Sequence, residues 1–167
     1  MRVNAGYTLL EILVVLVIIS IVAGMAILTI GHNDNKEVQT FTRELAQTLS
    51  LAEEQALLQP ATLGLMLTTR SFRFYEFRQT RAQTGWRPVS DRELGMHSVP
   101  KDIQLSLQID DKILSLESTE GKIPVLFVST NGTLTPFTLL IGKKNQTPRY
   151  KLIGRADGSI SSETYKG

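Results

Sequence analysis

The acidic residue Glu11 lies at the start of an apolar segment, where a charged side chain is energetically unfavourable. Glu11 precedes an apolar run over residues 12–30, in which Ser20 and Thr29 are the only polar residues. At about 1.5 Å per residue, a helix of this length crosses a hydrocarbon core of about 30 Å. An ionised carboxylate there costs about 3 kcal/mol or more. Two explanations stay open: Glu11 lies shallow, at a helix N-terminus whose dipole favours an anion, or it pairs with a partner's charge.

The other chemistry-bearing residues form no catalytic or metal-binding set. His32 and His97 are far apart and lack the spacing of metal ligands. Calcium is conceivable at Asp110, Asp111 and Asp157, but these lie at turn signals, where Asp is favoured for backbone reasons. The sequence contains no nucleophile–base pair, no phosphate-loop motif and no cysteine. It therefore predicts a protein that is not an enzyme, carries no cofactor or metal, and is held together by packing.

The residues around Glu11 resemble a known processing signal. The stretch GYTLLE at residues 6–11, with Arg2 before it and the apolar run after it, is similar to the signal of type IV pilins and pseudopilins, although Tyr7 replaces the commoner Phe. The resemblance implies that a prepilin peptidase cuts between Gly6 and Tyr7 and methylates the new amine of Tyr7. It also implies that Glu11 pairs with the N-terminal amine of a neighbouring subunit. Two costly membrane charges would then cancel only when subunits assemble.

Charge predicts the orientation of the chain. Arg2 precedes the apolar run and the next basic residue is Lys36, so the positive-inside rule places the N-terminus in the cytoplasm. With the resemblance, we expect a single pass through the inner membrane, in contact with its lipid, and a periplasmic C-terminal domain. The expected parts are a leader at 1–6, a transmembrane helix at 7–30, an amphipathic helix at 31–60 and a β-rich domain at 61–167.

The amphipathic helix is predicted by apolar residues at steps of three and four, which give one stripe facing a core. The stripe consists of Val38, Phe41, Leu45, Leu49, Ala52 and Ala56. Asp34 followed by Glu37 resembles a capping box with Asp34 as N-cap, and the chain near Gly31 is either a helix break or a polar interface. Pro60 disfavours helix at the residue before it, so we expect the helix to end near Gln59.

Beyond Pro60 the apolar period becomes two, which indicates strands. Strands are expected at 63–69, 71–79, 103–109 and 113–117, with a turn at 110–112. Residues 80–100 read as a polar loop with a short strand around Trp86. Two interpretations are open for Trp86 and its neighbours Arg78, Arg81 and Arg87. They form a partner-binding loop, or, as we prefer, Trp86 anchors the loop to the core. A long helix packed on antiparallel sheet makes the fold class α+β.

Two further hairpins are predicted by turn dipeptides that favour positive φ. Asn131-Gly132 separates strands at 125–129 and 133–141, and Asp157-Gly158 separates strands at 150–154 and 159–161. Pro136 inside a predicted strand indicates an edge or a bulge.

The first of these hairpins resembles the G-x-hydrophobic-T-P-F-x-L hairpin of the GspH/FimT group, the minor pseudopilin H group of type II secretion. The matching residues are Asn131, Gly132, Thr135, Pro136 and Phe137. The resemblance implies a subunit of the pseudopilus, a periplasmic filament that helps export folded proteins across the outer membrane. Its partners would be the major pseudopilin G and the minor pseudopilins I, J and K.

The alternative is a FimT-type minor pilin that binds DNA for uptake. That group carries Gly-Arg-x-Arg near its C-terminus, whereas this chain has Gly154 and Arg155 followed by Ala156 and Asp157. An acid beside a phosphate track repels it, so DNA is not the expected partner. The C-terminal third is nevertheless locally basic, through Lys143, Lys144, Arg149, Lys151 and Arg155.

Overall fold

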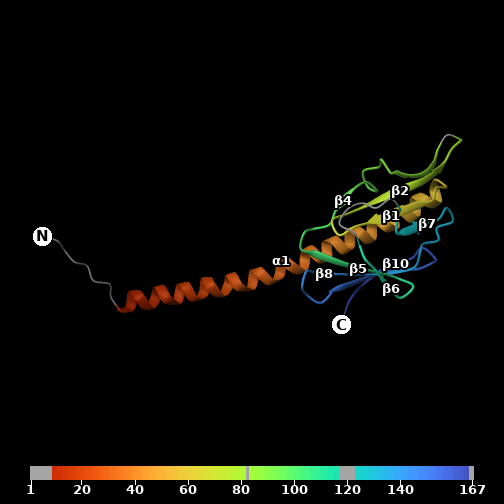
Figure 1. The fold of residues 1–167 in the computed structure, drawn as a ribbon. Coiled ribbons are helices and arrows are strands. Elements are labelled where there is room, and N and C mark those ends of the chain that lie inside the picture. The colour runs from red at the N-terminus through yellow and green to blue at the C-terminus, as the bar shows by residue number, and fades with distance from the viewer. Residues whose placement is uncertain (1–8, 82, 117–122, 166–167) are drawn as a thin grey trace. The chain divides into compact units, whose positions relative to one another are not determined.

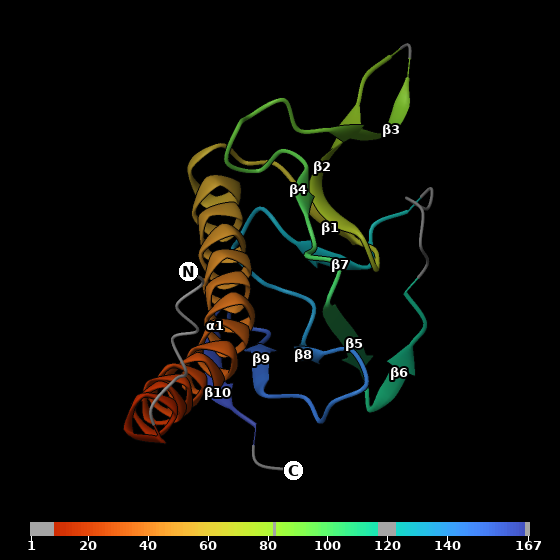
Figure 2. The same ribbon diagram turned by 90° about the vertical axis from the view of Figure 1, so that its left-hand side faces the viewer.

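A computed structural model describes residues 9–81, 83–116 and 123–165, with the side chains of residues 25–35 outside the description. Contacts divide the chain into two compact units, Met1–Glu37 and Val38–Gly167. Each unit is described by itself below. Figure 1 and Figure 2 show the elements in two views.

One helix, α1, spans Leu9–Leu58 (Figure 1). It continues through residue 31, so the expected N-cap at Asp34 is wrong: a capping residue must leave helical geometry, and Asp34 is helical. A single glycine costs a helix only about 1 kcal/mol, and no proline interrupts this stretch. The C-terminal end is as predicted, because the Gln59 backbone N–H donates to Gln55 O at 2.9 Å just before Pro60.

The predicted stripe of α1 is confirmed as the centre of the core. All six of its residues are at most 2% exposed. Two buried threonines on the same helix keep their hydroxyls satisfied, because Thr42 donates to Val38 O at 2.7 Å and Thr48 donates to Glu44 O at 2.9 Å. These backbone acceptors let polar side chains sit among apolar ones without an unpaired group.

The first sheet pairs strands in the order β3-β2-β1-β7, with β4 also on β2. Its strands are β1 Leu63–Leu67, β2 Ser71–Gln79, β3 Thr84–Pro88, β4 His97–Ser98 and β7 Leu126–Val128. The strands predicted at 63–69 and 71–79 are confirmed and pair with each other, and so is the short strand around Trp86, whereas β4 was not expected. Leu65, Phe72 and Phe74 are buried in the same core as the stripe of α1.

The second sheet runs in the order β10-β9-β8-β5-β6. Its strands are β5 Ile103–Ile109, β6 Lys112–Leu114, β8 Phe137–Lys143, β9 Tyr150–Gly154 and β10 Ile160–Thr164. Asp110 and Asp111 have φ of 49° and 59°, the conformation that a two-residue hairpin turn requires. The predicted β9–β10 hairpin is confirmed, with Gly158 at φ 87°. The fold class, α+β, is as predicted.

The hairpin predicted at Asn131-Gly132 is confirmed next to the turn, but its two arms do not continue as a pair of strands. The turn exists, but β7 pairs with β1 of the first sheet, while β8 pairs with β5 and β9 of the second. Close to the turn the two arms are joined by the Val128–Leu134 bridge and by backbone hydrogen bonds from Ser129 N–H to Thr133 O at 2.8 Å and from Thr135 N–H to Phe127 O at 2.9 Å. Pro136 has no N–H to donate to a ladder, and β8 begins immediately after it. The segment is therefore a crossing between sheets (Figure 2).

Candidate functional site

The predicted processing pair, Gly6 and Tyr7, lies outside the described residues. Glu11 lies in the first turn of α1 and is exposed. It is the only ionisable residue between Leu9 and Gly31. The N-terminal end of a helix favours an anion, so the helix itself contributes to holding a carboxylate at this position.

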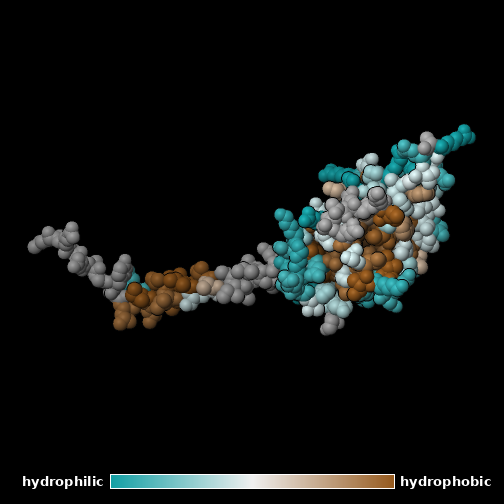
Figure 3. All heavy atoms as spheres, viewed as in Figure 1, coloured by the Kyte–Doolittle hydropathy of each residue, from teal (hydrophilic) through white to brown (hydrophobic). Residues whose placement is uncertain are grey.

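The helix around Glu11 presents a continuous apolar surface. Twelve large apolar side chains between Leu9 and Val22 are 45% to 85% exposed (Figure 3). The polar Ser20 is satisfied internally, since its hydroxyl donates to Leu16 O at 2.8 Å. In the described part of the chain, no helix has both the length and the apolarity of a membrane span. An exposed apolar patch of this extent marks a surface for lipid or for other apolar helices.

We call residues 131–137, which carry the resemblance to the GspH/FimT hairpin, the family loop. Its turn is closed by its own side chains. Asn131 Oδ1 accepts hydrogen bonds from the Thr133 backbone N–H at 3.1 Å and from the Thr133 hydroxyl at 2.8 Å. Gly132 has φ 79° and donates its N–H to Ser129 O at 2.9 Å. Asn131 therefore fixes a turn whose next residue needs the left-handed conformation that glycine tolerates.

This turn is wedged between the β9–β10 turn and the last turns of α1. A Cβ added to Gly132 would lie 3.1 Å from Leu57 Cδ2, and one added to Gly158 would lie 2.5 Å from Gly132 O. Glu53 Oε1 lies close to both positions, at 3.3 Å and 3.0 Å. Two glycine turns, distant in sequence, thus stack on each other and on the helix.

Thr135, Pro136 and Phe137 carry the chain from one sheet to the other. Thr135 is tied to the first sheet: its N–H donates to Phe127 O at 2.9 Å, and its Oγ1 accepts from the Phe127 N–H at 3.1 Å. Pro136 ends this pairing, and the buried Phe137 begins β8 opposite Gly154. The residues of the family loop therefore have a structural role, which is to fix the sheet crossing.

Trp86 anchors the β2–β3 ribbon, as we preferred. Its ring packs edge-on against Phe77, with ring centroids 5.2 Å apart, and lies 5.6 Å from the Phe127 ring. It also covers Gly64, where an added Cβ would lie 2.9 Å from Trp86 Cζ3. Pro124 lies closer still, with its Cβ and Cγ 2.6 Å from the added Cβ, so the ring and Pro124 together explain why this strand position has no side chain.

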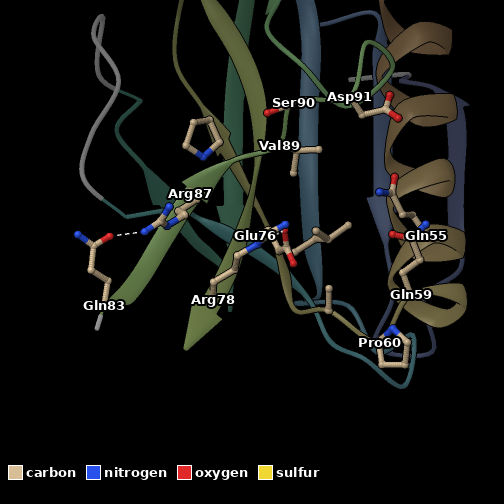
Figure 4. A pocket seen from close by; sticks show the side chains of 13 residues that line it. Gln55, Gln59, Pro60, Glu76, Arg78, Gln83, Arg87, Val89, Ser90 and Asp91 are labelled. Atoms are coloured by element: carbon tan, nitrogen blue, oxygen red, sulfur yellow. Dashed lines mark hydrogen bonds and ion pairs between the residues drawn. The ribbon is translucent and has the colours of Figure 1, made fainter. Parts of the chain in front are cut away.

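Arg78 and Arg87 of the ribbon line a groove of about 870 Å³ between β2–β3 and the C-terminal end of α1 (Figure 4), whereas Arg81 is not part of its lining. Arg78 Nε donates to Glu76 Oε2 at 2.8 Å, and Arg87 is hydrogen-bonded to Gln83. On the helix side the groove is lined by polar Gln55. With two arginines and two acids, Glu76 and Asp91, in its lining, the groove is mixed in charge and shows no single ligand chemistry.

His97 has a structural role that the sequence did not indicate. Its Nδ1 lies 2.9 Å from Glu44 Oε1 of α1, and its Nε2 lies 2.9 Å from Glu93 O. Its ring stacks on Phe72 with centroids 4.7 Å apart. His97 fastens β4 to the helix, and sequence spacing gave no indication of this because its partner lies 53 positions away.

The aspartates considered for calcium serve turns. Asp157 Oδ1 accepts from the Ser159 backbone N–H at 2.9 Å. Hydrogen bonds from Ser159, with a smaller contribution from the charge of Arg155, hold the pKa of Asp157 below its usual value. Asp110 and Asp111 lie in the β5–β6 turn, separated from Asp157 by the strands between. Among the described residues, no three potential metal ligands gather.

The basic residues considered for DNA do not form one track. Arg155 is held against the β10 side, with Nη1 3.3 Å from Ser161 Oγ, and Lys151 lies opposite Glu163 in the β9–β10 register. Lys143 and Lys144 lie at the other end of β9, about 17 Å away for a strand of this length. Opposite charge and separation both weaken a phosphate-binding path.

A long helix packed on two antiparallel sheets, with an apolar N-terminal part that carries one acid, defines a pilin-like subunit. Residues 1–27 match the prokaryotic N-terminal methylation motif. Residues 42–158 match the family described as type II transport protein GspH. Since this match covers most of the chain, the chain belongs to the GspH family.

Relatives agree with this assignment. The type II secretion system protein H of Pseudomonas aeruginosa is 27% identical over 158 residues, which cover 89% of each chain. That of Vibrio cholerae is 28% identical, covering 96% of this chain and 94% of the relative. In fold, the minor pseudopilin EpsH of the Vibrio cholerae type 2 secretion system has a TM-score of 0.66 at 24% identity, covering 79% of this chain and 96% of that one.

These findings confirm the predicted family and the α+β pilin-like fold. GspH proteins are structural subunits and not enzymes, so the prediction that this chain is not an enzyme is also confirmed. As a pseudopilin of type II secretion, the chain assembles with other pseudopilins of that system. The DNA-binding alternative is not favoured.

Proposed function

We propose that this chain is a minor pseudopilin of the type II secretion pseudopilus, matured by a prepilin peptidase and helping to export folded proteins across the outer membrane. Maturation would consist of cleavage after Gly6 and N-methylation of Tyr7. The observation that carries the proposal is the presence, on one chain, of the methylation motif at residues 1–27 and the GspH match at 42–158.

The apolar part of α1 supports an anchor in the inner membrane. Its side chains are exposed in the isolated chain, and Ser20 satisfies its own hydroxyl, as a lipid environment requires. The anchor would be residues 7–30, with the leader in the cytoplasm and the β-rich part, residues 61–167 with the helix 31–60, in the periplasm.

Glu11 would act during assembly. A carboxylate in an apolar helix is stabilised by a partner charge, and the new amine of Tyr7 on a neighbouring pseudopilin would supply it. The neighbours would be the major pseudopilin G and the minor pseudopilins I, J and K.

The function is tested by secretion from a strain that lacks this chain, with and without a complementing copy. We expect secreted hydrolase activity in the medium to fall and to return on complementation. Unchanged secretion in the deletion strain would contradict the proposal, and a loss of DNA uptake in the same strain would favour the pilus alternative.

The role of Glu11 is tested by Glu11→Gln, with Glu54→Gln as the matched control because Glu54 is an exposed acid on the same helix. Leaving one charge of a buried pair alone costs about 3–5 kcal/mol, so cross-linking to other pseudopilins should fall by at least about tenfold. Membrane insertion should be unchanged. Equal cross-linking of Glu11→Gln and Glu54→Gln would refute this role.

A further inference from the structure

Basic residues gather at one end of the Val38–Gly167 unit. Three connections meet there: residues 68–70 between β1 and β2, residues 99–102 between β4 and β5, and residues 143–149 at the end of β8. Asp102 is the only acid in these three segments. Their basic residues are Arg70, Lys101, Lys143, Lys144 and Arg149.

Backbone hydrogen bonds hold the three connections together. The Val99 N–H donates to Arg70 O at 2.8 Å, and the Lys144 N–H donates to Asp102 O at 2.9 Å. The side chains of Arg70, Lys101 and Lys144 line one open groove of about 990 Å³, and all three residues are exposed. We call these three residues the basic rim. Its cations come from distant parts of the sequence, so folding is what brings them together.

The basic rim lies at the end of the unit that α1 enters. Phe72, directly after the first connection, packs on Phe41 of α1 with ring centroids 6.2 Å apart. Phe41 lies one helical turn after Val38, where the unit begins. Figure 3 shows hydrophilic residues gathered at this end.

Chain length keeps this end close to the membrane in any orientation. The apolar run ends at residue 30, and seven residues separate it from Val38. This segment reaches about 12 Å as a helix and about 27 Å when fully extended. Val38, at the end of the unit where the rim lies, is therefore tethered within a few Debye lengths of the bilayer surface, since one Debye length is about 8 Å at physiological salt.

We propose that the basic rim binds anionic phospholipid headgroups of the membrane that anchors the chain, holding the subunit on the bilayer before it enters the filament. The inference rests on the anchoring proposed above. Guanidinium and ammonium N–H groups donate charge-assisted hydrogen bonds to phosphate oxygens. The bilayer is favoured over a free acidic partner because the tether gives it a high effective concentration.

The strength of the contact follows from the number of charges. Each Lys or Arg near an anionic surface contributes about a fivefold gain in membrane affinity. Three residues acting together give at most about a hundredfold preference of the β-rich unit for the anionic surface. Salt near 0.5 M should remove most of it.

The test uses the full chain in lipid nanodiscs, either of phosphatidylcholine alone or with about one third phosphatidylglycerol. The chain has no cysteine, so Thr147→Cys, in the third connection, accepts a single fluorophore. Quenching by a headgroup spin-labelled lipid then reports contact. Ser90→Cys, in an exposed loop between β3 and β4, is the reference position. We expect stronger quenching at position 147 in anionic discs, and little change at position 90.

The variant Arg70→Gln/Lys101→Gln/Lys144→Gln should abolish the effect of phosphatidylglycerol. Arg78→Gln/Arg81→Gln/Arg87→Gln loses the same charge from the ribbon and should retain it. Equal quenching in both discs, or equal loss in both variants, would overturn the proposal. If 10 mM inorganic phosphate suppresses the quenching at position 147 and chloride of equal ionic strength does not, the rim is a site for free phosphate and the lipid proposal is wrong. If the full chain does not insert into either kind of nanodisc, the proposed membrane anchor is refuted, and the rim proposal fails with it.

Discussion

Replacing Gly154 by alanine tests the packing that underlies the family loop. In the β8–β9 register Gly154 lies opposite Phe137. A Cβ added to Gly154 would lie 2.6 Å from Phe137 Cδ1, nearer still to Cε1, and 2.8 Å from Leu134 Cδ2. Phe137 is only 4% exposed, so its ring cannot swing into solvent without leaving the core. Overpacking of this kind costs about 1–3 kcal/mol.

A double-mutant cycle isolates this contact from other effects of alanine. Phe137→Leu alone should destabilise by about 1–2 kcal/mol through lost packing. In that background the ring edge that meets Gly154 is gone, and of the three nearest contacts to the added Cβ only the Leu134 methyl, at 2.8 Å, remains. We expect Gly154→Ala to cost less than about 1 kcal/mol there, which gives a coupling energy of about 1–2 kcal/mol.

Urea unfolding of the full chain in detergent, followed by fluorescence of Trp86, measures these free energies. Trp86 is the only tryptophan, but it lies in the first sheet while Gly154 lies in the second. Circular dichroism must therefore give the same midpoint, which checks that both sheets unfold together. In thermal unfolding, 1 kcal/mol corresponds to about 4 °C for a unit of this size.

Ser162→Ala is the control, because Ser162 is an exposed residue on the neighbouring strand β10. Its effect should stay within about 0.5 kcal/mol in both backgrounds. If Gly154→Ala costs the same in the original chain and in the Phe137→Leu background, the ring is not what excludes a side chain, and the reasoning fails.

Two further predictions concern hydrogen bonds. His97→Phe should keep the stacking on Phe72 but lose the bonds to Glu44 and to Glu93 O, lowering the free energy of unfolding by about 1–2 kcal/mol; a cycle with Glu44→Ala should show the two changes to be non-additive. Asp157 has a pKa below its usual value of 3.8, so its contribution is present above pH 3.8 and is lost as the pH falls through the lower folded pKa. Asp157→Asn should therefore flatten the stability profile between about pH 5 and about pH 2, and an unchanged profile would contradict the role of the Ser159 bonds.

The helix was predictable because its signal is local. The residues from Val38 to Ala56 repeat at steps of three and four, and one helix face must meet one core whatever lies opposite. The strands of the second sheet were readable for the same reason, since Ile103, Leu105 and Leu107 alternate with polar residues. Such periods predict which face is buried, and the structure confirms this for the whole helix stripe.

Strand pairing was less predictable because partners lie far apart. Asn131-Gly132 correctly predicted a turn, but Leu65 of β1 is the pairing partner of Leu126, and no turn dipeptide encodes that choice. The same holds for the missed β4, a strand of two residues defined by Ser71 and Phe72 across from it. Contacts such as that of His97 with Glu44 depend on the assembled core, so sequence spacing alone does not reveal them.

Packing and turn hydrogen bonds explain both how this chain agrees with the Gly-Arg-x-Arg pattern of DNA-uptake pilins and how it departs from it. Gly154 is required because Phe137 occupies the space above it, so a glycine followed by arginine here is explained by packing and does not by itself indicate DNA. Where the pattern has its second arginine, Asp157 instead accepts the Ser159 N–H and closes the β9–β10 turn. Arg155 lies beside two serines of the same hairpin. The segment thus stabilises the turn that packs on Gly132, consistent with a subunit whose C-terminal hairpin supports the sheet crossing.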